Sequence, residues 1–363
     1  MSFLFKAILL ISLLPLICEG ENHSAGDSTR KERKVSFAGI ALPSSNPENG
    51  FYVQGGLLAL FKTQQKDSML RTSNLYLFGL YSQQKQYRFS LGGDIFTKNE
   101  NWYINGWYYY SYLPELFFGT GNNVSPDNKE FLNYRVWYLN TNVLKRIHDK
   151  WFAGIVYTYE KLYDFNAVTG GLVDQYKPLG AEDYTYTNQG IRVRYDSRDF
   201  IISSKKGLYL DMSFNFSSKA LGSNYQFSQY NIDARKFFNL APKKYHVLAF
   251  NFLLQNTIGT APFRYLPNIT ARGYHPNLYK DNSLLSMQME YRLLIWRFIG
   301  ASFFGGASEV AGNFSDMNFS YIRENIGAGL RFRIIKKQNM FLRIEYGMSH
   351  NTSNYYVSFY DAF

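Results

Sequence analysis

Strict alternation of apolar and polar side chains over about ten residues is the feature that most constrains how this chain can fold. In the stretch 207–216 (GLYLDMSFNF), every second side chain from Leu208 to Phe216 is apolar, and Asp211, Ser213 and Asn215 lie between them. The pattern recurs at 189–196, 286–293 and 341–347. Because successive side chains of a strand point to opposite faces, each stretch predicts a strand with one apolar and one polar face.

A soluble antiparallel sandwich also alternates, but it turns its apolar face inward against a second layer. Here the polar faces carry charged side chains, which leaves few bulky apolar residues for a second core layer. Aromatic residues make up 18% of the 363 residues, yet the mean hydropathy is −0.29. Transmembrane barrels combine these properties, because only alternate residues face lipid and aromatic girdles lie at both interfaces. We therefore predict an all-β fold, a transmembrane antiparallel β-barrel.

The alternation and the turn signals predict fifteen strands, at 51–62, 69–82, 85–97, 101–114, 130–147, 150–163, 185–197, 207–218, 222–238, 243–258, 284–296, 298–310, 320–335, 339–349 and 354–363. Single-chain bacterial barrels have even numbers of strands. We therefore predict about sixteen and place the missing strand within 163–183.

The N-terminal segment 1–20 predicts a secretory signal peptide. Lys6 is followed by an apolar run, 7–17, that is too short to span a bilayer as a helix. The polar segment 21–34 is predicted to be a periplasmic tail, and 35–363 to be the barrel. This organisation predicts a protein of the cell outer membrane.

The cysteine count and the charge balance exclude several function classes. Cys18 is the only cysteine, so the mature chain is expected to lack disulfides and a thiol nucleophile. Lipidation of Cys18 is the alternative, but bulky Leu16 and Ile17 precede it where a small residue is expected. The net charge of +11 is spread along the chain, and export argues against a nucleic-acid partner.

A loop between two predicted strands, which its position predicts to be exposed, contains Arg272-Gly273-Tyr274. A buried guanidinium must be paired, or its desolvation costs several kcal/mol. Glycine allows the backbone to pass close to a wall, and a tyrosine can pack there while its hydroxyl stays hydrogen-bonded. The alternative is that Arg272 is an ordinary loop arginine facing solvent.

Three signatures follow one another along the second half of the chain. They are the run from Arg194 to Asp199 with Lys206-Gly207, the Arg-Gly-Tyr loop with Met289-Glu290-Tyr291-Arg292, and the C-terminal stretches 300–304, 327–332, 342–347 and 356–363. In this order they resemble the bacterial surface-antigen barrel family, the outer-membrane insertase and transporter superfamily that includes BamA and TamA. The resemblance covers about residues 185–363.

The resemblance implies a sixteen-stranded barrel in which an extracellular loop folds into the lumen and five strands follow it. It implies that acidic residues on the inner wall hold Arg272, and Glu290 matches the first of them. The second would lie near Gly306, where this chain has no carboxylate, and Glu345 is the expected substitute. We name this predicted set the lumen-loop lock: Arg272, Gly273, Tyr274, Glu290 and Glu345.

Two further sets are predicted near strand ends. Asp196, Arg198 and Gly207 are interpreted as a structural element of the barrel wall rather than as a catalytic pair. Phe359 and Phe363 end an alternating strand and resemble the signal that the cell's barrel-assembly machinery recognises. The alternative is that these two are interface-girdle aromatics.

No catalytic residue, metal site or cofactor is predicted, because the five histidines show no paired spacing and no Gly-x-Ser-x-Gly elbow is present. His275, beside the Arg-Gly-Tyr triplet, is interpreted as a polar loop residue.

The resemblance implies assistance to protein or lipid insertion, assembly or translocation, through edge strands that open and template an incoming strand. The expected partners are outer-membrane lipid, the assembly machinery and a periplasmic partner or client. The alternatives are an outer-membrane lipid enzyme and a passive anion-preferring pore lined by Arg192, Arg194, Arg292 and Arg343.

Overall fold

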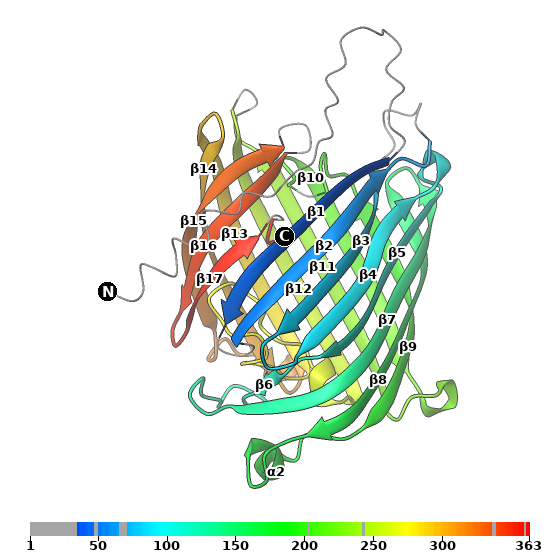
Figure 1. The fold of residues 1–363 in the computed structure, drawn as a ribbon, viewed down its shortest axis with the longest axis vertical. Helices are drawn as coiled ribbons and strands as arrows, with labels where there is room; N and C mark the ends of the chain where they lie inside the picture. The colour runs from blue at the N-terminus through cyan, green and yellow to red at the C-terminus, as the bar shows by residue number, and fades with distance from the viewer. Residues whose placement is uncertain are drawn as a thin grey trace, which may run out of the picture.

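A computed structural model describes residues 35–46, 50–64, 71–201, 203–241, 244–335, 339–358 and 361–363. These residues contain seventeen strands. All of them except β6 follow one another in an antiparallel meander, which therefore has 16 strands. Figure 1 shows the sheet curling into a barrel, with β1 to β4 in front and β11 and β12 behind. The predicted all-β barrel fold is confirmed.

The first half of the meander comprises β1 (Val35–Asn46), β2 (Gly50–Phe61), β3 (Ser73–Ser82), β4 (Tyr87–Phe96), β5 (Trp102–Tyr112), β7 (Glu130–His148), β8 (Trp151–Asn166) and β9 (Tyr184–Asp196). The second half comprises β10 (Gly207–Ser217), β11 (Gln226–Asn239), β12 (His246–Thr260), β13 (Ser283–Trp296), β14 (Ile299–Ala311), β15 (Arg323–Ile335), β16 (Met340–Ser349) and β17 (Ser353–Ser358). The short strand β6 (Glu115–Phe117) pairs only with β7.

Alternation along the strands sets which side chains line the barrel interior. In β10, Asp211, Ser213 and Asn215 are buried, whereas Phe216 is exposed on the outer wall. A charged or polar side chain on the inner face contacts other inner-wall groups, and the outer face is left apolar. The predicted faces of this strand are therefore confirmed.

The predicted place of the missing strand is wrong. The missing strand is β1, whereas the stretch 163–183 holds the end of β8 and a short helix, α2 (Leu172–Tyr176). Gly170 and Gly180 have positive φ angles there, which interrupt an extended backbone. The sequence of β1, VSFAGIALPSSN, is rich in small residues, so its alternation is weak.

The barrel interior is filled in part by the chain itself. Residues 261–282, between β12 and β13, fold inward and pack against the inner wall; we call them the in-folded loop. They contain the 3-10 turn η3 (Phe263–Tyr265) and contribute Phe263, Ile269 and Leu278 to two buried apolar clusters. Among the described residues, no helix is both long and apolar enough to cross a membrane.

Candidate functional site

Arg272 lies at the tip of the in-folded loop and is bound by two carboxylates of the inner wall. Its Nη2 is 2.6 Å from Oε2 of Glu290, and its Nη1 is 2.8 Å from Oε2 of Glu345. The guanidinium also lies over the ring of Phe304, 3.5 Å from the ring centroid. Arg272 is only 7% exposed, so the solvent-facing alternative does not describe this residue.

The carboxylates of Glu290 and Glu345 both reach Arg272 because small residues on the strands between them leave space on the inner wall. Glu290 is on β13 and Glu345 on β16, with β14 and β15 between. Gly329 of β15 is paired with Glu345, and a Cβ on this glycine would lie 2.4 Å from the glutamate Cγ. The missing side chain at Gly329 thus allows the Glu345 stem to lie across β15. Beside it, the hydroxyl of Ser302 donates to Glu345 over 3.0 Å.

The backbone around Gly273 is tied to the last strands of the barrel. Gly273 has a φ of 111°, and a Cβ there would be 2.8 Å from the carbonyl carbon of Met348. Its N–H donates to the hydroxyl of Tyr356, and its carbonyl accepts from the hydroxyl of Thr352. Glycine is required here both by the positive φ and by the close approach of the two backbones.

Tyr274 completes the attachment of the tip. Its hydroxyl donates to the backbone carbonyl of Glu324 over 2.6 Å, and its own carbonyl accepts from the side-chain amide of Asn354. The structure thus brings together all five residues of the lumen-loop lock.

Glu290 is also the centre of a wider buried charge network. Besides Arg272 it binds Arg292 at 2.9 Å and Arg331 at 3.1 Å, and both of these guanidinium groups also contact Asp361. Arg343 pairs with Glu345 at 2.8 Å. Four guanidinium groups therefore share three carboxylates inside the barrel. Glu290 contacts Arg272, Arg292 and Arg331, and Asp361 contacts Arg292, Arg331 and, at 3.9 Å, Arg343.

The C-terminal residues contradict the predicted strand 354–363. β17 ends at Ser358, and the side chain of Asp361 and the whole of Phe363 are buried. The Phe363 ring packs with Phe237 and Phe341, so Phe363 is not a girdle aromatic on the outer wall. Ion pairing of Asp361 with two guanidinium groups holds this turn of the chain, a long-range contact that alternation cannot reveal. Phe359 lies outside the described residues.

Asp196, Arg198 and Gly207 lie together where β9 ends and β10 begins. Arg198 donates to both carboxylate oxygens of Asp196, over 2.9 and 3.0 Å. Arg71, which the sequence did not indicate, binds the same carboxylate at 3.0 Å. Gly207 opens β10 with a φ of 118°. The Asp196 carboxylate is engaged by two arginines, an arrangement that suits a wall element better than acid–base chemistry.

A second cluster, absent from the sequence-based prediction, anchors the start of the in-folded loop. Arg264 is 2.9 Å from Oε2 of Glu115 and 2.6 Å from Oε1 of Glu160. Asn277 donates to Glu115, and the Nζ of Lys280 lies 3.9 Å from the same carboxylate. Each of these contacts joins a residue of the in-folded loop to a glutamate more than a hundred residues earlier in the chain. No local sequence pattern can therefore indicate them.

Lys280 is buried, and within the described part of the chain its Nζ has no hydrogen-bond partner. Burial lowers the pKa of Lys280 to about 8 from its ordinary 10.5. Between these values the unfolded chain binds more protons than the folded chain, so the free energy of unfolding rises with pH.

We expect Lys280→Met to be more stable than the parent below pH 8, by at most about 3 kcal/mol, with the difference shrinking toward pH 10. Unfolding midpoints of the purified barrel at pH 7 to 9.5 measure this. A constant difference across that range would contradict the assignment.

The arginines predicted to attract anions all have carboxylate partners. Arg192 and Arg194 both bind Asp211, Arg292 binds Glu290 and Asp361, and Arg343 binds Glu345. His275 lies parallel to the Phe118 ring at 6.1 Å between centroids. Across the described ranges, no group of three or more His, Cys, Asp or Glu residues could hold a metal ion.

Two solved structures share this architecture. BamA from Haemophilus ducreyi lacking POTRA domains 1-3 matches with a TM-score of 0.54 and 14% identity, over 90% of this chain and 69% of that one. CdiB from Escherichia coli matches with a TM-score of 0.56 and 10% identity, over 92% of this chain and 62% of that one. No protein-family model and no curated protein matches the sequence. The chain therefore has the fold of the BamA and CdiB barrels, and the predicted resemblance to the BamA barrel is confirmed at the level of the fold.

Proposed function

We propose that this protein is an outer-membrane barrel that assists the insertion, assembly or translocation of another protein, or of lipid, at that membrane. The observation that carries the proposal is the seam between the first and last strands. Within the described residues, no hydrogen-bond ladder joins β1 to β17, although every other pair of consecutive meander strands is joined. Unpaired strand edges present backbone N–H and C=O groups that can pair with an incoming strand.

The two sides of the seam are held differently. β1 pairs with β2 along all 12 of its residues, whereas β17 has only 6 residues paired with β16. β17 gains additional support from the in-folded loop, through Tyr356 to Gly273 and Asn354 to Tyr274. We infer that the lumen-loop lock keeps the edge of β17 in place while a client strand approaches the seam.

The outer wall supports a membrane location. Its exposed side chains include Ile155, Ile191 and Ile326, each at least 60% exposed. Such a band of apolar side chains suits contact with lipid. We propose outer-membrane lipid as a partner, the cell's barrel-assembly machinery as the route of insertion, and a periplasmic protein as the source of clients.

A disulfide across the seam tests lateral opening. Apart from Cys18 the chain contains no cysteine, so one cysteine placed in β1 and one in β17 form the only engineered pair. We expect an oxidised pair to abolish function and a reductant to restore it, with each single-cysteine variant as the control. If cells with the oxidised barrel keep a normal outer-membrane proteome, lateral opening is not required.

Depletion of the protein, followed by quantitative comparison of outer-membrane proteomes, supplies the readout. A fall in a defined subset of barrels or surface lipoproteins supports the proposal and identifies the clients. An unchanged proteome together with altered solute uptake would instead indicate a channel.

A further inference from the structure

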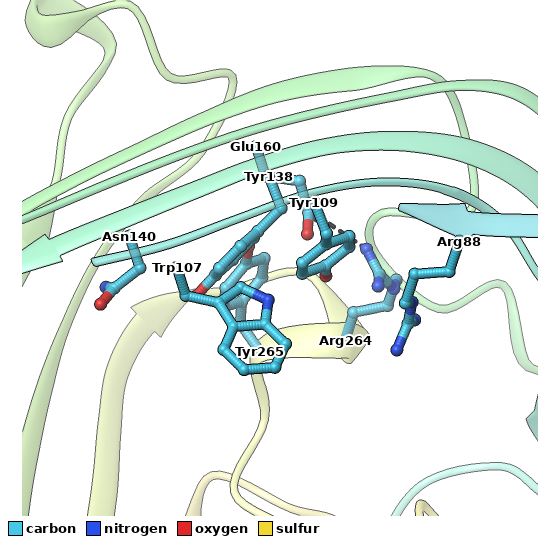
Figure 2. Close-up of a pocket in the computed structure, with 8 residues that line it drawn as sticks. All are labelled: Arg88, Trp107, Tyr109, Tyr138, Asn140, Glu160, Arg264 and Tyr265. Atoms are coloured by element: carbon cyan, nitrogen blue, oxygen red, sulfur yellow. Dashed lines mark hydrogen bonds and ion pairs between the residues drawn. The ribbon is translucent and has the colours of Figure 1, made fainter. Parts of the chain in front are cut away.

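A cavity of about 500 Å³ lies on the inner wall (Figure 2), and none of the residues that line it belongs to the lumen-loop lock. Its walls come from β4, β5, β7 and β8 and from the η3 turn of the in-folded loop. Small-molecule sites in proteins commonly have volumes of roughly 300–1,000 Å³. The cavity is therefore large enough for a ligand of one or two sugar-sized rings.

The cavity contains one uncompensated cation. Arg264 lines it but is neutralised by Glu115 and Glu160. The side chain of Arg88, in contrast, has no hydrogen bond or ion pair within the described residues, and its Nε is buried without a partner. Its guanidinium lies only against the ring of Tyr109, 4.9 Å from the centroid. An arginine in this state offers its fork of N–H donors to a carboxylate or a phosphate.

Aromatic rings form the body of the cavity. Trp107, Tyr109, Tyr138 and Tyr265 line it, and Tyr109 and Tyr138 are stacked with centroids 4.7 Å apart. The hydroxyl of Tyr265 is buried and has no partner in the described part of the chain. Figure 2 shows Trp107 between Asn140 at one side and Arg88 at the other. A ligand placed there meets a flat apolar face in the middle and polar groups at both ends.

This distribution of groups matches one ligand chemistry. A pyranose has an apolar C–H face, which packs on an aromatic ring, and a rim of hydroxyls, which an amide and a phenol can bind. We propose that the cavity binds an anionic saccharide, with its carboxylate or phosphate on Arg88 and its ring against Trp107. The proposal does not depend on insertion activity, because it concerns an occupant of the lumen rather than the seam.

Titration of the full-length protein in lauryldimethylamine oxide micelles tests this; maltoside detergents are avoided because their headgroup is itself a sugar. The probes are glucuronic acid, glucose 1-phosphate, glucose and inorganic phosphate. Binding of each probe is measured by calorimetry and by tryptophan fluorescence. We expect at least one acidic sugar to saturate the protein, and glucose to bind at least tenfold more weakly. Saturation by glucuronic acid or by glucose 1-phosphate identifies the anionic group as carboxylate or phosphate.

Several results would overturn the proposal. They are no saturation by either acidic sugar, equal affinity for glucose, or binding of inorganic phosphate alone as tightly as the sugar phosphate, which would indicate a simple anion site. Preferential binding of a peptide that ends in phenylalanine would assign the cavity to protein clients instead.

Matched variants connect the binding to the cavity. We expect Arg88→Gln to weaken the acidic sugar at least tenfold, and Arg297→Gln, at an exposed turn residue between β13 and β14, to have no effect. Trp107→Leu should weaken acidic and neutral sugars alike, which provides a second test if the first variant folds poorly. Equal affinities of the Arg88 and Arg297 variants would overturn the assignment.

Discussion

Replacement of Arg272 by alanine is expected to lower the free energy of unfolding by about 3 kcal/mol and to reduce the yield of folded barrel. Removal of one partner of a buried ion pair commonly costs about 3–5 kcal/mol, because the remaining charge stays buried. The lower end applies here, since Glu290 keeps Arg292 and Arg331, and Glu345 keeps Arg343. Heat-modifiable migration on gels, measured against temperature, reports the folded fraction.

The matched control for this change is Arg297→Ala, which removes an exposed arginine. Arg272→Lys keeps the charge but loses the two-pronged geometry, so its loss of stability should lie between those of the parent and the alanine variant. Unchanged yield and an unchanged transition temperature in Arg272→Ala would contradict a stabilising role for the lumen-loop lock.

Glu290→Ala is expected to destabilise the barrel more than Arg272→Ala does. This change leaves three guanidinium groups, those of Arg272, Arg292 and Arg331, without one of their carboxylates in a site that solvent does not reach. We expect a loss of at least about 4 kcal/mol, measured from the same folded-fraction curves. Glu324→Ala is the control, because that side chain is exposed while its backbone carbonyl still accepts from Tyr274.

The double variant Arg272→Ala/Glu290→Ala separates direct pairing from general damage. Residues in one ion-pair network are not additive, so the loss in the double variant should be smaller than the sum of the two single losses. Strict additivity would mean that Arg272 and Glu290 stabilise the barrel independently. It would also remove the reason to treat the loop tip and the inner wall as one unit.

Period-two alternation alone determined which face of each clearly alternating strand points inward. Alternate side chains of a strand point to opposite faces of the sheet, so each set faces either the lumen or the lipid. The set that contains charged side chains cannot face lipid. Glu290 and Glu345 could therefore be placed in the lumen before any contact was known. That they would hold Arg272 did not follow from alternation; the family resemblance implied it. The same logic failed for β1, because small residues such as Gly39 and Ala41 mark neither face.

Only the tertiary structure decided which charged groups meet. Arg264 binds a carboxylate 149 residues away, and Arg71 binds one 125 residues away, across strands brought together by the curvature of the sheet. The inward turn of Asp361 and Phe363 depends on buried arginines of two other strands. Local sequence specifies the face of a side chain because geometry repeats every two residues. It does not specify a partner, because that depends on strand register and on how the barrel curves.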